Sequence, residues 1–206
     1  MSTKANIIMS IVSKDYCSPS EVVHVVRRRP NVANGGGFVV ADSCQRVVFT
    51  VDGCGILGKK EELILRDGEG NALLLIRRKG AIVEALSFTR QWKGFTYDFL
   101  GAQKLVFTLK EPNSCFSNKI SIKISIELKE YCRYGNFEIR GDFRGRSCSI
   151  VNSRGDIVAE IGLKEMGQVI ESNDFYHVII KAGIDQAFVF GVIAVLDYIY
   201  DGSTRC

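Results

Sequence analysis

The stretch that decides the fold reads GIDQAFVFGVIAVLDYIYDG, residues 183–202, and lies near the end of a chain of 206 residues. It contains ten apolar or small residues in a row, from Ala187 to Leu196. Such a run is longer than the about five or six residues of a usual strand, so a helix is favoured. Asp185 can serve as the N-cap of this helix, and the closing glycine stands where a helix terminator is expected. The sequence therefore predicts a helix over about residues 185–201.

A helix that is apolar on every side has to be surrounded by protein on every side. A membrane span needs about 20 apolar residues without charge, whereas Asp197 interrupts this run, so we expect no transmembrane segment. A closed β-barrel can surround such a helix, and a helix buried in a β-sandwich or at a dimer interface is the alternative. The structural residues of the predicted helix are Asp185, Phe188, Phe190, Gly191, Ile193 and Leu196.

The chain from Val22 to Ile180 is a succession of short β-branched and aromatic runs separated by Gly, Asn and Asp, which is typical of an all-β architecture. About a dozen such runs are present, among them VVHVVRR, RVVFTV, ELILR, ALLLIRR, KLVFTL, KISIKISIEL, SCSIV and FYHVIIK. A barrel of about a dozen strands is too wide for its own side chains to fill, so the helix fits its lumen. We therefore predict a mainly β fold, a closed antiparallel barrel of about twelve strands around a central hydrophobic C-terminal helix.

The chain is expected to form one domain over residues 22–206. Only three prolines occur, and no Ser/Pro/Gly-rich spacer separates two blocks of different composition. The first residues show no sustained period and contain Ser, Lys, Asp and Pro. We therefore expect residues 1–21 to be a flexible N-terminal tail.

No recognisable catalytic or metal-binding motif is present. The seven cysteines include no C-x-x-C pair, the two histidines each lie within a β run, and no G-x-S-x-G or H-E-x-x-H sequence occurs. We therefore expect no enzyme activity, no catalytic residue, no metal and no cofactor. The N-terminal apolar patch is too short for a secretory signal, so we expect a cytoplasmic protein with reduced thiols, and peripheral membrane attachment or nuclear entry stays open.

The net charge of +4 is mild, and we do not expect the chain to bind nucleic acid directly. The basic residues are nevertheless clustered, which can produce patches that the net charge conceals. Such patches can attract an anionic phospholipid surface. The candidate contacts to such a surface are Lys59, Lys60, Arg77, Arg78 and Lys79.

Several pieces of the chain, in the same order, resemble one known family. The pieces are FVVADSCQRVVFTVDG, LRDGEGNALLLIRRKG, ALSFTRQWKGF and the closing helix, and they are similar to the plant LURP-one-related proteins over about residues 22–202. The resemblance implies a tubby-like fold, a barrel of about twelve strands around a central helix that tubby proteins and phospholipid scramblases share. It also implies a link to plant defence. Tubby proteins bind phosphoinositides and act as membrane-tethered transcription regulators.

Two functions from different classes follow. In the first, the protein is a non-enzymatic binding module that docks on anionic phospholipid, phosphoinositide in particular, through its basic clusters. In the second, it is a cytosolic or nuclear interaction domain that presents its barrel to a protein partner and has no lipid ligand. Because one fold hosts many functions, the fold alone does not choose between the two.

Overall fold

The computed structural model describes residues 8–29, 36–53, 61–79, 90–98, 101–111, 122–127, 136–163 and 174–205 of the chain. Within these ranges the chain forms twelve β-strands and one long apolar helix. The strands are β1 (Val22–Arg29), β2 (Gly37–Ala41), β3 (Val47–Asp52), β4 (Glu62–Asp67), β5 (Ala72–Arg78), β6 (Gln91–Tyr97), β7 (Gln103–Lys110), β8 (Ile122–Ile126), β9 (Asn136–Asp142), β10 (Ser147–Asn152), β11 (Ile157–Gly162) and β12 (Phe175–Ile180). The helical elements are the 3-10 helix η1 (Lys14–Tyr16), the α-helix α2 (Gln186–Leu196) and the π-helical turn η3 (Asp197–Asp201).

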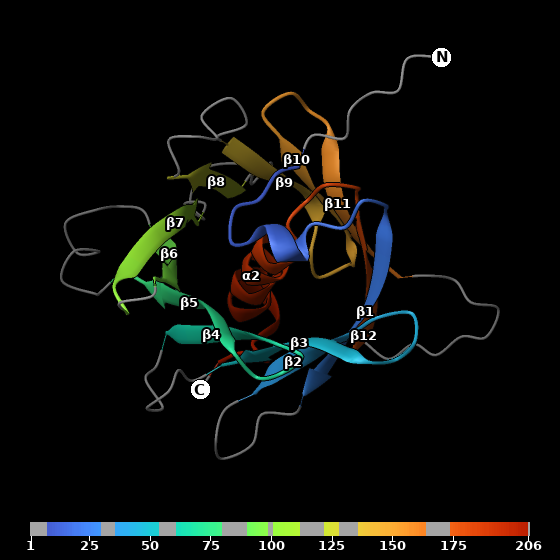
Figure 1. The fold of residues 1–206 in the computed structure, drawn as a ribbon. Helices are drawn as coiled ribbons and strands as arrows, with labels where there is room; N and C mark the ends of the chain where they lie inside the picture. Colours follow the sequence, from blue (N-terminus) through green and yellow to red (C-terminus); the bar gives the residue numbers. More distant parts are fainter. Residues whose placement is uncertain are drawn as a thin grey trace.

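The strands form one closed antiparallel barrel. Each strand pairs with the next along the chain, and β1 pairs with β12 to close the ring. In this closing pair Val22 lies opposite Ile180, and Arg27 lies opposite Phe175. Helix α2 lies in the lumen with the strands around it (Figure 1). The predicted fold, a closed barrel around a hydrophobic C-terminal helix, is therefore confirmed.

The alternation of side chains along each strand separates the core from the surface. In β8, Ile122 and Ile124 are buried, whereas Lys123 between them is exposed. The core cluster contains side chains from every strand together with those of α2. Since successive side chains of a strand point to opposite faces, one set fills the space around the helix and the other forms the outer wall.

Helix α2 is apolar all round, and ten of its eleven residues are buried. Asp185 is its N-cap, as predicted, because the side-chain carboxylate accepts a hydrogen bond from the backbone N–H of Phe188. The α-helical pattern ends at Leu196, and the next five residues form the π-helical turn η3. This turn ends at Gly202, whose φ of 78° is left-handed and favours glycine. The predicted helix is therefore present, but its last turn is π-helical.

Residues 8–21 do not form the flexible tail that we expected. Met9 and Ile11 are buried in the core. Three consecutive backbone amides, from Ile11 to Ser13, donate hydrogen bonds of 2.9, 2.6 and 3.0 Å to Oδ2 of Asp185. The segment lies over the N-terminal end of α2 (Figure 1, blue). The physical reason is that a fully buried carboxylate needs several donors, and these amides supply them.

Charged side chains lie at the opposite end of the helix. Oδ1 of the fully buried Asp197 lies 3.3 Å from Nε of Arg28, and its Oδ2 accepts a hydrogen bond from the N–H of Thr204. Asp201 lies 2.7 Å from Nη2 of Arg146, whose side chain is also buried. Burial raises the pKa of Asp197, and its hydrogen bonds and Arg28 act in the opposite direction. These buried charges are tolerated because each has an oppositely charged partner.

Candidate functional site

The basic cluster at the end of β5 is held by acidic side chains. Nε of Arg77 lies 2.6 Å from Oε2 of Glu62, its partner across the strand pair, and Nη1 of Arg77 is within 3.3 Å of Gln103. Arg78 forms an ion pair with Glu61. Both arginine charges are therefore balanced locally by carboxylates, which weakens the attraction of this cluster for an anionic surface.

The other predicted site residues fall into two groups. Lys59 and Lys60 lie outside the described residues, whereas Lys79 follows β5 with a half-buried side chain. The six residues predicted to be structural, Asp185, Phe188, Phe190, Gly191, Ile193 and Leu196, are all buried at the N-cap or within α2. Arg77 and Arg78 are consecutive residues of β5, where successive side chains point to opposite faces, so the structure does not gather them into one patch. It places the predicted helix residues in the core.

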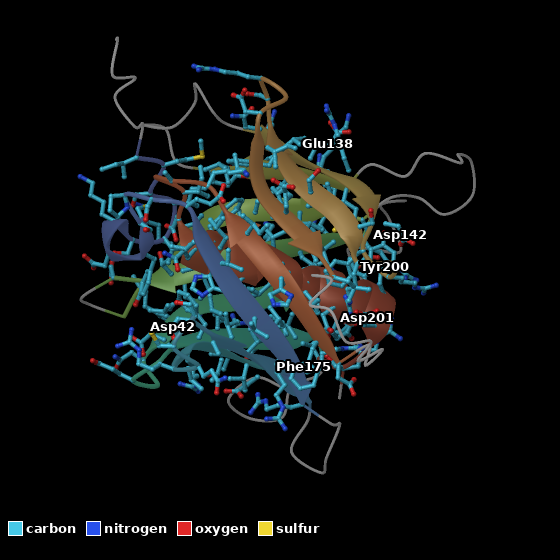
Figure 2. All side chains as sticks on the ribbon, turned by 90° about the vertical axis from the view of Figure 1, so that its right-hand side faces the viewer. Asp42, Glu138, Asp142, Phe175, Tyr200 and Asp201 are labelled. Atoms are coloured by element: carbon cyan, nitrogen blue, oxygen red, sulfur yellow. The ribbon has the colours of Figure 1, made fainter. Side chains whose placement is uncertain are left out.

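An open groove of about 790 Å³ lies on the outer wall of the barrel, over β9, β10, β11, β12 and β1. Figure 2 faces this wall, on which Glu138 and Asp142 mark β9 and Phe175 marks the beginning of β12. Five small residues are among those that line the groove: Gly141, Gly145, Ser147, Ser149 and Gly162. The groove was not among our predicted sites.

Strand register orders the side chains of this wall into two rows. The first row crosses five strands and contains Val23, Ile179, Glu160, Ser149 and Arg140. The second row contains Val25, His177, Gly162, Ser147 and Asp142. Because side chains alternate along a strand, the members of both rows face outward. The first row is apolar on β1 and β12, whereas the second row has His177 on β12. Both rows are polar toward β9.

Exposed apolar side chains gather on this wall. Among the described residues seven large apolar side chains are strongly exposed, and four of them belong to β1, β11, β12 or the residue after β11. These four are Val23, Ile157, Leu163 and Phe175, with exposed fractions of 39%, 44%, 60% and 43%. The first three line the groove, whereas Phe175 lies outside its lining. Single exposed apolar residues are ordinary, but a group around a hollow is typical of an interaction surface.

Gly162 leaves open space in the wall of the groove. A Cβ atom added at Gly162 would have the carbonyl oxygen of Arg146, at 3.8 Å, as its one described neighbour within 4 Å. Its φ lies outside the left-handed region, so larger residues can adopt its backbone conformation. Gly141 differs, because its φ is +98° and an added Cβ would lie 2.2 Å from the carbonyl oxygen of Ser147. Gly162 is thus the position at which the groove can be filled without backbone strain.

The polar groups of the groove are unevenly satisfied. Nη2 of Arg140 lies 3.5 Å from Glu138, and the arginine side chain is 55% exposed. Glu160 is held 3.0 Å from Nζ of Lys181. The hydroxyl groups of Ser147 and Ser149 make no hydrogen bond with any described residue. The β9–β10 side of the groove therefore offers hydrogen-bond donors, while the negative charge of Glu160 is already balanced.

The cysteine that lines the groove is poorly suited to nucleophilic chemistry. Burial raises the pKa of Cys148 to about 12. The thiolate is the nucleophilic form of cysteine, so this side chain is protonated at neutral pH. What the groove offers is apolar surface, a guanidinium group and hydroxyl groups, and these are groups that recognise a ligand.

A sequence signal for this wall exists in hindsight. In β1 and β12, whose sequences are VVHVVRRR and FYHVII, four outward positions are apolar: Val23, Val25, Phe175 and Ile179. A barrel strand with one wet face normally alternates apolar and polar residues. Sequence alone does not show that β1 and β12 are neighbours or that a glycine lies beside them on β11.

The fold defines a class: a closed antiparallel β-barrel wrapped around an apolar C-terminal helix, as in the tubby-like arrangement. Over the described ranges, no helix has the length and apolar character that crossing a membrane requires. The same part of the chain contains no group of three or more His, Cys, Asp or Glu side chains that could hold a metal ion.

Comparison with known proteins identifies the family. The family model of LURP-one-related proteins matches residues 22–197, and the chain therefore belongs to the LURP-one-related family. It is 54% identical to Protein LURP-one-related 6 of Arabidopsis thaliana, over 96% of this chain and 99% of that protein. It is 50% identical to Protein LURP-one-related 16 of the same organism, over 95% of each chain. An X-ray structure of a protein from Arabidopsis thaliana has a similar fold, with a TM-score of 0.62 and 20% identity over 92% of this chain and 97% of that one.

Proposed function

We propose that the protein is a non-enzymatic binding module that docks a protein partner in the groove over β9–β12 and β1. The observation that carries the proposal is the gathering of exposed apolar side chains around a hollow of about 790 Å³. Apolar contact area with a few placed polar groups is what a specific protein interface needs at its centre. A role in plant defence, which the family resemblance implies, is the setting in which we would look for this partner.

Docking on anionic phospholipid is the second candidate, and the charges of the described residues favour it less. Such a surface attracts a protein through several uncompensated Lys and Arg side chains, each contributing about 1 kcal/mol. Arg77 and Arg78 are paired with Glu62 and Glu61, and Glu160, which lines the groove, is paired with Lys181. A protein partner with both apolar and polar contacts fits this balanced surface better than a uniformly negative membrane does.

Filling the groove with a larger side chain tests the proposal. Gly162→Leu adds a side chain where the structure has space, and Ser125→Leu adds the same side chain on β8, away from the groove. We expect the wild type and Ser125→Leu to recover the same proteins from plant extract, and Gly162→Leu to lose them. Equal recovery by all three chains would refute docking in the groove.

Flotation with liposomes provides the complementary measurement. We expect no selective, salt-sensitive flotation with phosphoinositide vesicles compared with neutral vesicles. If such flotation occurs and is lost when Arg77, Arg78 and Lys79 are neutralised together, lipid docking replaces the protein partner as the function.

A further inference from the structure

We propose that the occupant of the groove is a protein segment that carries an acidic residue two or three positions from a large aromatic residue. This inference rests on the proposed function and names the chemistry of the partner. It assigns two subsites, an aromatic subsite over Gly162 and an anion subsite at Arg140 and the neighbouring serines.

A glycine–aromatic pair inside the barrel supports the aromatic subsite. Inside the barrel Gly94 and Phe107 are paired across β6 and β7, and the ring of Phe107 lies so close that a Cβ on Gly94 would be 2.2 Å from it. A glycine between larger neighbours thus provides a flat surface on which a ring can lie. On the outer wall Gly162 provides the same kind of surface, and no described side chain covers it.

The walls of the aromatic subsite are mainly apolar, with His177 directly opposite Gly162 on β12. Ile179 and Val23 lie opposite one another on β12 and β1, and Leu163 directly follows Gly162. All three line the groove, and Leu163 is 60% exposed. An aromatic side chain buries more apolar area than any other type and loses few rotatable bonds, which makes it the best anchor for such a site.

An exposed arginine and two serine hydroxyl groups without a described hydrogen-bond partner support the anion subsite. Arg140 is 55% exposed, is held loosely by Glu138 at 3.5 Å, and lies next to Ser149 across the strand pair. The hydroxyl groups of Ser149 and Ser147 have no described partner and can donate toward the same carboxylate. Two carboxylates adjoin this subsite. Glu160 is paired with Lys181 at 3.0 Å and therefore repels an incoming carboxylate little. Asp142 lies opposite Ser147 and accepts a hydrogen bond from the backbone N–H of Arg144, so the subsite is centred on Arg140 and Ser149, the next outward-facing pair along the same two strands.

The spacing of the two subsites sets the spacing in the partner. Arg140 and Gly162 are separated by two strand steps and by one pair of residues along the strands. With strands about 4.8 Å apart and a rise of about 3.4 Å per residue, this is roughly 12 Å between backbone positions. Residues two or three positions apart in an extended segment are about 7 to 10 Å apart, and their side chains span the remainder.

The experiment is a selection from a phage library of random peptides of about twelve residues, on the full wild-type chain, with counter-selection on Gly162→Leu. We expect enriched peptides to carry Asp or Glu two or three positions from Phe, Tyr or Trp. A synthetic peptide of this pattern should bind Gly162→Leu at least about tenfold more weakly than wild type or Ser125→Leu. Thermal unfolding of each variant checks that the barrel is intact.

Charge reversal separates this inference from the function on which it rests. The Arg140→Glu variant should bind the acidic peptide at least about tenfold more weakly than wild type does. It should prefer a peptide in which Lys replaces the acidic residue. Two results would overturn the inference but not the proposed function: groove-dependent peptides that lack acidic residues, or an Arg140→Glu chain that still prefers the acidic peptide. Absence of any groove-dependent enrichment overturns both. Competition of the peptide by anionic vesicles assigns the groove to a membrane and also overturns the inference.

Discussion

His24 illustrates how a single buried side chain couples stability to pH. Its Nε2 lies 2.8 Å from Oε1 of Gln186, and its ring packs edge-on against Phe190 at 5.5 Å between centroids. Burial lowers the pKa of His24 below its ordinary value of 6.5, although the hydrogen bond with Gln186 acts in the opposite direction. Protonation of this ring therefore favours the unfolded chain.

The sign of the pH dependence follows from this shift. Because the unfolded histidine binds a proton before the folded one does, stability falls as the pH drops below 6.5. We expect wild type to lose up to about 1.4 kcal/mol of unfolding free energy per pH unit in this range, and His24→Gln to lose less. Urea unfolding at about pH 7.5 and about pH 5.5 measures this. An equal loss in both chains would place the titration elsewhere.

The carboxylate of Asp185 joins helix α2 to the N-terminal segment. It caps α2 through Phe188 and accepts three hydrogen bonds from amides more than 170 residues away in the sequence. Burial raises the pKa of Asp185, and these backbone hydrogen bonds oppose that rise. The N-terminal segment is therefore part of the barrel closure at this end of the helix.

Removal of this carboxylate should be costly. We expect Asp185→Ala to lose about 3 kcal/mol or more of unfolding free energy, because it removes a helix cap and leaves buried amides without an acceptor. Asp185→Asn should lose less, since one oxygen can still accept from the amides. Urea unfolding measures both variants, with Asp156→Ala as the control, because Asp156 is exposed and its side chain accepts a hydrogen bond from the side chain of Asn152. A loss in Asp185→Ala no greater than in Asp156→Ala would contradict this account.

Most elements could be predicted from sequence, and the exceptions have a common physical cause. The runs VVHVVRR and ALLLIRR became β1 and β5 within one residue, and Asp185 and Gly202 marked the helix ends, because these signals are local. The N-terminal segment is held by backbone amides, which carry no side-chain pattern. The groove depends on which outward residues meet across five strands, and that information lies in the register.

At the scale of the molecule, the helix makes the barrel a single cooperative unit. Phe188 packs against Phe107 on β7 and Phe137 on β9, with ring centroids 5.7 and 5.0 Å apart. Phe190 packs against Phe49 on β3 at 5.3 Å. Opposite walls thus share one apolar core, and opening either wall exposes the helix to water. Half of the barrel alone could not bury its apolar inner face.

We therefore expect unfolding in one transition despite a chain length at which intermediates are common. Trp92, the single tryptophan, is fully buried and packs against Tyr198 near the end of the helix, so its fluorescence reports the helix–wall contact. Far-ultraviolet circular dichroism reports the strands, and the two urea transitions should coincide. Phe188→Ala should shift both transitions together by about 3 to 5 kcal/mol, since it empties the centre of the shared core. If Trp92 became exposed before the strands were lost, the helix could leave the barrel independently, and closure of the wall would not depend on it.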